Sequence, residues 1–168
     1  MSSYFYAIIP YKSDISVTPE EPCVYYPILP ELKCIESEFT DRESLELYPD
    51  FLMINLCYRK SAFTENKDGY SWIRSEICQI ARALGAMEVW YADELAIQEM
   101  DDWEFSFEDW VVRIKNEQLV VELTQEILKG KEIYGFYHDD FSDIIMERPP
   151  KMKYKKFADG WRKVLCDE

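Results

Sequence analysis

The strongest constraint on the fold is an amphipathic helical pattern that runs from residue 71 to residue 84. Its apolar side chains recur at helical spacing, and Gly85 follows, the residue type that often ends a helix in the left-handed conformation. The apolar positions are Ile73, Ile77, Ile80, Ala81 and Leu84. A helix with one apolar stripe has to bury that stripe against another element, so the chain needs a surface to receive it.

Short apolar runs that are rich in β-formers supply this surface. Residues 4–9, 51–58 and 87–91 each have the length and composition of a strand, and 51–58 is almost continuously apolar. Residues 132–137 indicate a final strand. Residues 23–28 lie among prolines and predict an edge strand at most.

Further helices are expected at four places. Residues 40–48 begin with a capping box, residues 106–114 and 119–127 carry helical stripes, and residues 157–165 have apolar side chains at helical spacing. Helices and strands therefore alternate without a clean βαβ repeat. This order predicts an α+β fold, with mixed α/β as the alternative, in which a central sheet of about four to five strands is packed by helices on at least one side.

Chain length favours a single globular domain over residues 1–168. Residues 149–168 carry six basic and three acidic side chains, whereas residues 85–148 carry five basic and seventeen acidic ones. The basic C-terminal segment 149–168 is therefore expected to pack back on an acidic body. The alternative is that the acidic middle segment is a docking surface rather than a solvated face.

Composition excludes several classes of function. The net charge of −14 disfavours binding to nucleic acid or to an anionic membrane surface, because both depend on Lys and Arg. No apolar run approaches the roughly 20 residues of a membrane span, and the first residues do not resemble a signal peptide. The five cysteines form no C-x-x-C pair, which argues against zinc sites and disulfide frameworks. We expect a soluble cytoplasmic protein without a cofactor.

Recognisable catalytic motifs are absent. The sequence contains no P-loop, no G-x-G-x-x-G and no G-x-S-x-G, and it has a single histidine. Cys57 and Cys78 lie inside apolar elements, where a thiol behaves as a small hydrophobe. These features leave enzymatic activity open but favour a binding role.

One candidate binding segment combines acidic and aromatic side chains. It consists of Asp101, Asp102, Trp103, Glu104 and Phe105. Aromatic anchors surrounded by carboxylates suit a basic protein surface, because aromatics supply binding energy and charge steers the encounter. The alternative is that Trp103 and Phe105 are loop residues packed against the sheet.

A second candidate site gathers carboxylates and the histidine after two predicted strands. It consists of Asp93, Glu94, His138, Asp139 and Asp140. If the two strands are parallel, their carboxyl ends meet at one edge of the sheet, and the side chains there suit Mg²⁺ or Mn²⁺. The simpler explanation is that aspartates after strands form turns and cap helices.

The leading functional hypothesis is a cytoplasmic binding protein that engages a basic macromolecular partner, in its concrete form an inhibitor or immunity-type protein. The first alternative is a small Mg- or Mn-dependent hydrolase that uses the carboxylate–histidine cluster. The second is a structural or assembly subunit that buries its aromatics at a self-interface. The sequence does not distinguish a monomer from a homodimer.

Overall fold

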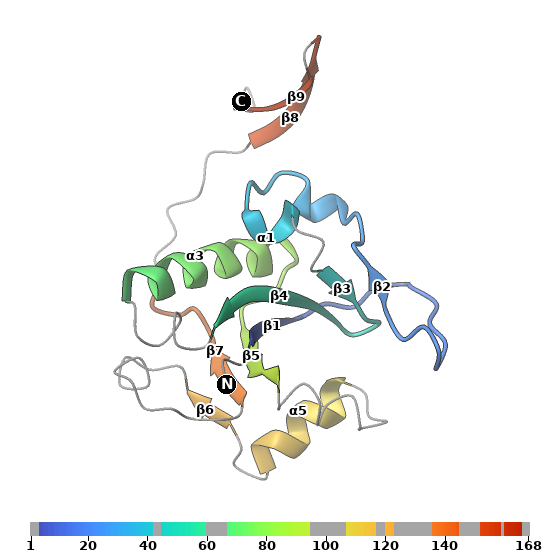
Figure 1. Cartoon of the computed structure of the whole chain (residues 1–168), viewed down its shortest axis with the longest axis vertical. Helices are drawn as coiled ribbons and strands as arrows, with labels where there is room; N and C mark the ends of the chain where they lie inside the picture. The colour runs from blue at the N-terminus through green and yellow to red at the C-terminus, as the bar shows by residue number, and fades with distance from the viewer. Residues whose placement is uncertain are drawn as a thin grey trace.

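A computed structural model places most of the chain. It describes residues 4–41, 45–59, 67–94, 107–116, 120–122, 136–144, 152–158 and 160–165. In this part, seven strands form one sheet in the order β2-β3-β4-β1-β5-β7-β6 (Figure 1). All neighbouring strands are antiparallel except β6 and β7, which are parallel. The α+β prediction is confirmed, and the sheet is larger than expected.

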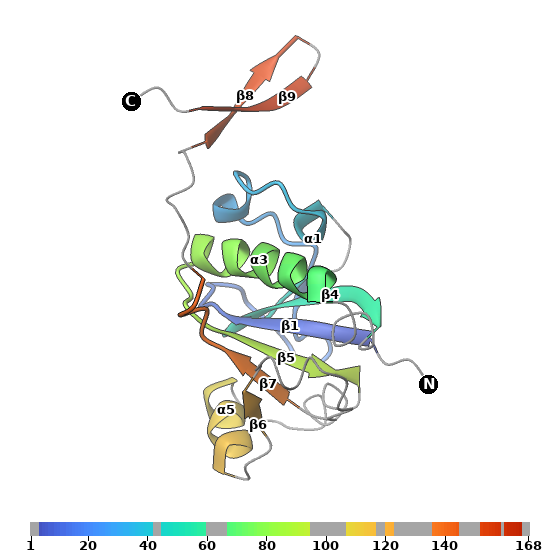
Figure 2. The ribbon, with the colours of Figure 1, turned by 90° about the vertical axis from the view of Figure 1, so that its left-hand side faces the viewer.

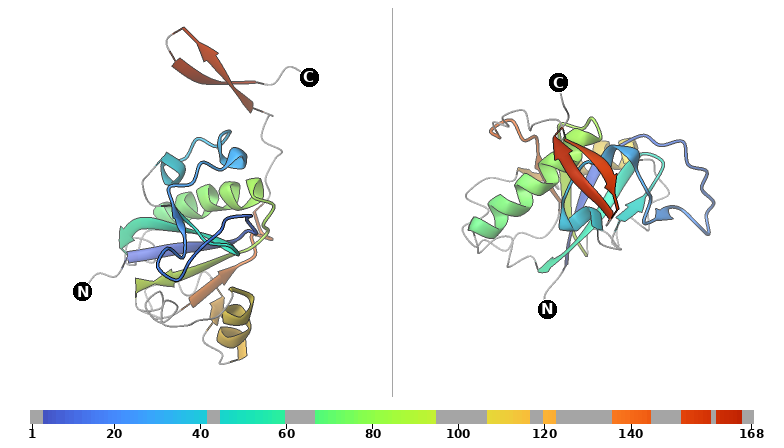
Figure 3. Two further views of the ribbon diagram at one scale, coloured as in Figure 1. Left: turned by 90° about the vertical axis from the view of Figure 1, so that its right-hand side faces the viewer. Right: turned by 90° about the horizontal axis from the view of Figure 1, so that it is seen from above.

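The strands of this sheet are β1 (Tyr4–Pro10), β2 (Val24–Tyr25), β3 (Leu45–Leu47), β4 (Phe51–Arg59), β5 (Val89–Asp93), β6 (Val120–Glu122) and β7 (Phe136–Asp139). The helices are the short 3-10 helix η1 (Pro30–Leu32), α1 (Glu38–Asp41), α3 (Lys67–Ala83) and α5 (Phe107–Asn116). Figures 1 and 3 show α3 and α5 on opposite sides of the strands.

Helix α3 covers one face of the sheet with the predicted apolar stripe. Ile73, Ile77 and Ile80 are buried in one core with alternate residues of the central strands. The helix ends as the sequence predicts. Gly85 has φ +78°, the Ala86 amide donates to the Ala81 carbonyl at 2.8 Å, and the Gly85 amide donates to the Arg82 carbonyl at 3.0 Å.

The opposite face of the sheet is also buried. Ile8 of β1 pairs with Trp90 of β5 and with Met53 of β4, and all three side chains are almost inaccessible to solvent. Helix α5 reaches this face, since the Lys115 ammonium lies 5.2 Å from the centre of the Trp90 ring. The central strands are therefore apolar on both sides, which explains why residues 51–58 show no alternation.

Three predicted helices, at residues 40–48, 119–127 and 157–165, are wrong, and the first two contribute strands to the large sheet. Within residues 40–48, helix α1 ends at Asp41 and residues 45–47 form strand β3, whose alternating burial fits Leu45 and Leu47 facing the core. Residues 120–122 of the predicted helix 119–127 are strand β6, and the remaining residues lie outside the described part.

The C-terminal segment is a hairpin, not the helix suggested by its apolar spacing. Strands β8 (Met152–Phe157) and β9 (Gly160–Leu165) pair antiparallel as a separate two-stranded sheet. Figures 2 and 3 show this hairpin apart from the seven-stranded sheet. The single domain over residues 1–168 and the packing of residues 149–168 onto the body stay predictions. Among the described helices, none has the length and apolar character needed to cross a membrane.

Candidate functional site

A pocket of about 460 Å³ opens at one end of the sheet, between the end of β1, the residues that follow α3 and helix α5. Its apolar lining comes from Pro10, Leu84, Val111 and Val112. Gly85 and Tyr11 also line it. The volume lies within the range of roughly 300–1,000 Å³ that is typical of small-molecule sites.

Acidic side chains dominate the charged lining of this pocket. Asp50 comes from the turn before β4, Glu88 precedes β5, and Glu108 lies in the first turn of α5. Among the described residues that line it, Lys12 is the one with a basic side chain. We refer to the pocket with these three carboxylates as the acidic pocket.

Tyr11, which lines the acidic pocket, lies close to further carboxylates. Its hydroxyl donates to Glu31 Oε1 at 3.3 Å. Burial, the Glu31 carboxylate and the charge of Asp14 together raise the pKa of the Tyr11 phenol. The negative charge near the pocket therefore extends beyond its own lining.

Glu88 is held in place by the single histidine of the chain. His138 Nε2 lies 2.7 Å from Glu88 Oε2, and the imidazole packs on Trp90 with 4.5 Å between ring centres. The Glu88 side chain is 42% exposed and the His138 side chain is 24% exposed, so the pair is accessible to solvent and does not belong to the core. A lining carboxylate fixed in this way loses little conformational freedom when it binds a cation.

The predicted carboxylate–histidine cluster is not brought together, because its premise of parallel strands is wrong. Strands β5 and β7 are antiparallel, and Asp139 lies opposite Val89. Asp93 is four residues further along β5, roughly 13 Å away at the usual rise per residue. Glu94 lies at the same far end. Among the described residues, no group of three or more ligating side chains is arranged to hold a metal ion.

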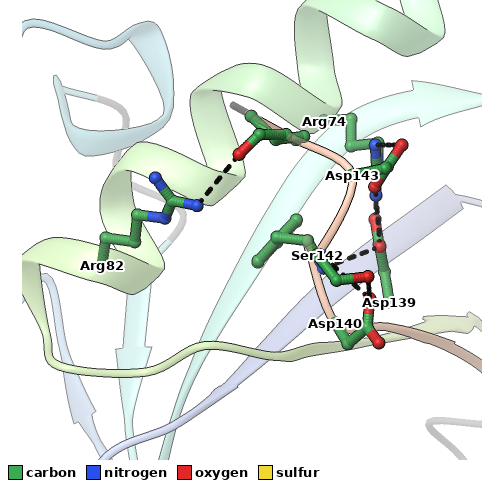
Figure 4. Close-up of polar contacts among 8 residues, drawn as sticks. Arg74, Arg82, Asp139, Asp140, Ser142 and Asp143 are labelled. Atoms are coloured by element: carbon green, nitrogen blue, oxygen red, sulfur yellow. Dashed lines mark hydrogen bonds and ion pairs between the residues drawn. The ribbon is translucent and has the colours of Figure 1, made fainter. Parts of the chain in front are cut away.

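Asp139 instead forms an ion pair with helix α3. Arg74 donates to both its carboxylate oxygens, from Nε at 2.5 Å and from Nη2 at 2.6 Å (Figure 4). The same guanidinium donates to Asp143 and lies over the Phe141 ring. Arg82 continues the link by donating to the Ile144 carbonyl at 3.2 Å. These contacts tie the segment after β7 to α3.

Asp140 and Asp93 have local roles. Asp140 Oδ1 accepts hydrogen bonds from the Ser142 amide and hydroxyl, which lower the pKa of Asp140 and stabilise the turn after β7 (Figure 4). Asp93, the last residue of β5, is buried. Burial, and secondarily the charge of Asp93, raises the pKa of the Tyr137 phenol. Asp139 Oδ1 likewise accepts from the Phe141 amide at 3.2 Å, so the turn-forming role of aspartates after strands is observed at both Asp139 and Asp140.

The predicted acidic–aromatic segment lies outside the described residues. This applies to Asp101, Asp102, Trp103, Glu104 and Phe105. Helix α5 begins at Phe107, next to where its N-terminus was expected, and it exposes Glu108 and Asp109 in its first turn. Of the acidic residues in the middle segment 85–148, Glu88 and Glu108 line the acidic pocket.

Sequence reasoning did not identify the acidic pocket. Its lining comes from separate segments around Tyr11, Asp50, Gly85, Glu88 and Val111. No local motif joins them. Two signals were present in the sequence: the 30 residues without Lys or Arg between Arg82 and Arg113, and the glycine that ends α3.

We expect buried and exposed cysteines to differ strongly in reactivity. Burial raises the pKa of the Cys78 thiol, and the nearby Arg82 and Arg74 only partly oppose this, so little reactive thiolate forms. Cys34 is exposed. Titration of the folded chain with an aromatic disulfide at pH 8 should lose about one fast-reacting thiol in Cys34→Ser. Cys78→Ser should leave the fast phase unchanged, and a fast-reacting Cys78 would contradict its burial.

No family model, curated protein or solved structure matches this chain. Its functional interpretation therefore depends on the geometry and charge of its own residues.

Proposed function

We propose that this chain is a cytoplasmic binding protein that engages a basic protein partner through its acidic middle segment. Its mode of action would be that of an inhibitor or immunity-type protein that covers a positively charged cleft. The observation that carries the proposal is the acidic pocket, where Glu88 and Glu108 of the middle segment meet Asp50 beside an apolar wall. The exposed thiol of Cys34 suits a reducing compartment.

The chemistry of this surface favours a protein partner. Val112 and Met87 are 56% and 61% exposed, so apolar area adjoins the carboxylates. Apolar contacts supply binding energy when they are removed from water, and surrounding charges raise the association rate and select the partner. A surface that is both acidic and partly apolar fits a basic protein better than it fits a simple cation.

The test is a salt-stepped capture on the tagged full chain, followed by reconstitution with the purified protein that it retains. Asp101, Asp102 and Glu104 are reversed to lysine in one variant, and Glu108→Lys is a second. We expect each to weaken binding of the purified partner by about tenfold or more at low salt. Raising the salt should weaken wild-type binding as well.

The control is Glu20→Lys combined with Glu21→Lys, because both residues are exposed and lie outside the acidic pocket. This variant reverses two charges elsewhere on the chain, one fewer than the triple variant and one more than Glu108→Lys. We expect less than about a twofold effect. Equal losses in test and control variants would reduce the interaction to unspecific charge attraction, and a partner of acidic or neutral character would refute the proposal.

A second candidate function, an assembly subunit, is favoured by the edge strand β2. This strand ends the sheet, and the apolar side chains around it are exposed: Val24 40%, Tyr25 61%, Tyr26 50% and Ile28 83%. Exposed apolar edge strands readily pair with other chains. Sedimentation velocity at two concentrations should then show a larger species that Ile28→Lys removes. A concentration-independent monomer would exclude this alternative.

A further inference from the structure

We propose that the acidic pocket receives an arginine side chain of the basic partner, with its guanidinium on the lining carboxylates and its methylene groups against the apolar wall. The inference rests on the proposed function and names the chemistry that the site recognises. It depends on three properties of the pocket: its size, the arrangement of its carboxylates and the open space above Gly85.

The pocket is large enough for a whole side chain, at about 460 Å³. Leu84, Val111 and Pro10 give it an apolar lining, and Asp50, Glu88 and Glu108 give it acceptors. Long basic side chains combine an apolar stem with a charged head, and each part needs its own surroundings. The lining offers both in one cavity.

The carboxylates favour arginine over lysine. They come from three separate elements: the turn before β4, the residue before β5 and the first turn of α5. A guanidinium presents five donors in a planar fork and is weakly hydrated, whereas an ammonium presents three donors from one strongly hydrated point. Acceptors contributed by three separate elements therefore suit the guanidinium better. Within the described part of the lining, Lys12 is the one basic residue, and three carboxylates against it leave an excess of negative charge.

One acceptor is already oriented. Glu88 Oε2 lies 2.7 Å from His138 Nε2, and the imidazole itself packs on the buried Trp90. This contact engages one carboxylate oxygen of Glu88, so the other oxygen, Oε1, can accept from a ligand. Such preorganisation raises affinity because less freedom is lost on binding.

Gly85 is a lining position at which a side chain can be added without a clash. A Cβ atom built on Gly85 meets no atom within 4 Å, and Gly85 lines the pocket. Its φ of +78° disfavours most side chains, but asparagine tolerates this conformation. Gly85→Asn therefore places a side chain toward open space while keeping the helix end.

The experiment is an NMR titration of the full chain with three capped amino acids: N-acetyl-arginine N-methylamide, its lysine counterpart and its citrulline counterpart. Citrulline has nearly the shape of arginine but no charge. We expect the arginine probe to shift the amide signals of Gly85, Glu88 and Val111, with a dissociation constant on the order of millimolar. Lysine should bind several-fold more weakly, and citrulline about tenfold more weakly.

Two variants locate the binding. Gly85→Asn and Glu108→Gln should each weaken arginine binding about tenfold, whereas Glu20→Gln should leave it unchanged. If Gly85→Asn does not fold, Glu108→Gln carries the test alone. Equal binding of arginine and citrulline, tighter binding of lysine, or shifts that neither variant reduces would overturn the inference.

The two proposals fail separately. A purified basic partner that binds through the acidic middle segment, without any response of the pocket to arginine, would refute the inference and leave the proposed function standing. Arginine binding in the pocket without a basic partner in the capture experiment would support the pocket chemistry and refute the proposed function.

Discussion

Replacement of Arg74 by methionine is expected to lower the free energy of unfolding by about 3–5 kcal/mol. The Asp139 side chain is only 4% exposed, and Arg74 neutralises it with two parallel hydrogen bonds at 2.5 and 2.6 Å. Removal of the guanidinium leaves a buried carboxylate without its counter-charge, and the cost of that charge exceeds the modest net value of the intact pair. Urea unfolding followed by circular dichroism measures the loss.

A double variant separates the buried charge from lost packing. Asp139→Asn in the Arg74→Met background removes the charge but keeps an oxygen for the hydrogen bond that Asp139 Oδ1 accepts from the Phe141 amide at 3.2 Å. We expect the double variant to recover to within about 1–2 kcal/mol of the wild type. A double variant as unstable as Arg74→Met alone would assign the loss to side-chain packing.

The second partner of Arg74 serves as a matched control. Asp143 accepts from the same guanidinium but is 71% exposed, so Asp143→Asn should cost less than about 1 kcal/mol. Hydrogen bonding to Arg74 lowers the pKa of Asp143. A carboxyl group whose pKa is lower in the folded state stabilises the fold above its ordinary pKa, and this stabilisation is lost as the pH falls. Asp143→Asn should therefore remove a small part of the loss of stability in acid.

The elements that sequence reasoning predicted correctly are those with a strong local pattern. The stripe of Ile73, Ile77 and Ile80 needs no knowledge of the rest of the chain, because helical periodicity and the glycine cap are local. Residues 45–47 became a strand because β2 and β4 flank them in the sheet. A three-residue strand between two partners depends on contacts with distant residues, which a local capping-box pattern cannot predict.

The direction of β7 relative to β5 and the lining of the acidic pocket also depend on contacts between distant residues, so local patterns could not predict them. Asp93 and Asp139 were expected together because each follows a strand, but the sequence does not say that β5 and β7 are antiparallel. The acidic pocket joins residues as far apart as Tyr11 and Val111. What the sequence did show was the excess of acid in the middle segment. The structure adds where its described members Glu88 and Glu108 lie.

Replacement of Phe5 by alanine is expected to cost about 3–5 kcal/mol of unfolding free energy. Phe5 is 1% exposed, and its ring packs on Tyr91 at 5.7 Å and on Tyr137 at 5.6 Å between ring centres. These rings come from β1, β5 and β7, so the variant removes packing that links three neighbouring strands. A cavity remains, because strands held by backbone hydrogen bonds cannot close it.

Tyr4→Ala is the control, because Tyr4 precedes Phe5 on the same strand and is 46% exposed. We expect it to cost less than about 1 kcal/mol in the same urea titration. Equal losses at the two positions would contradict the arrangement in which β1 directs Phe5, and not Tyr4, into the core beneath α3.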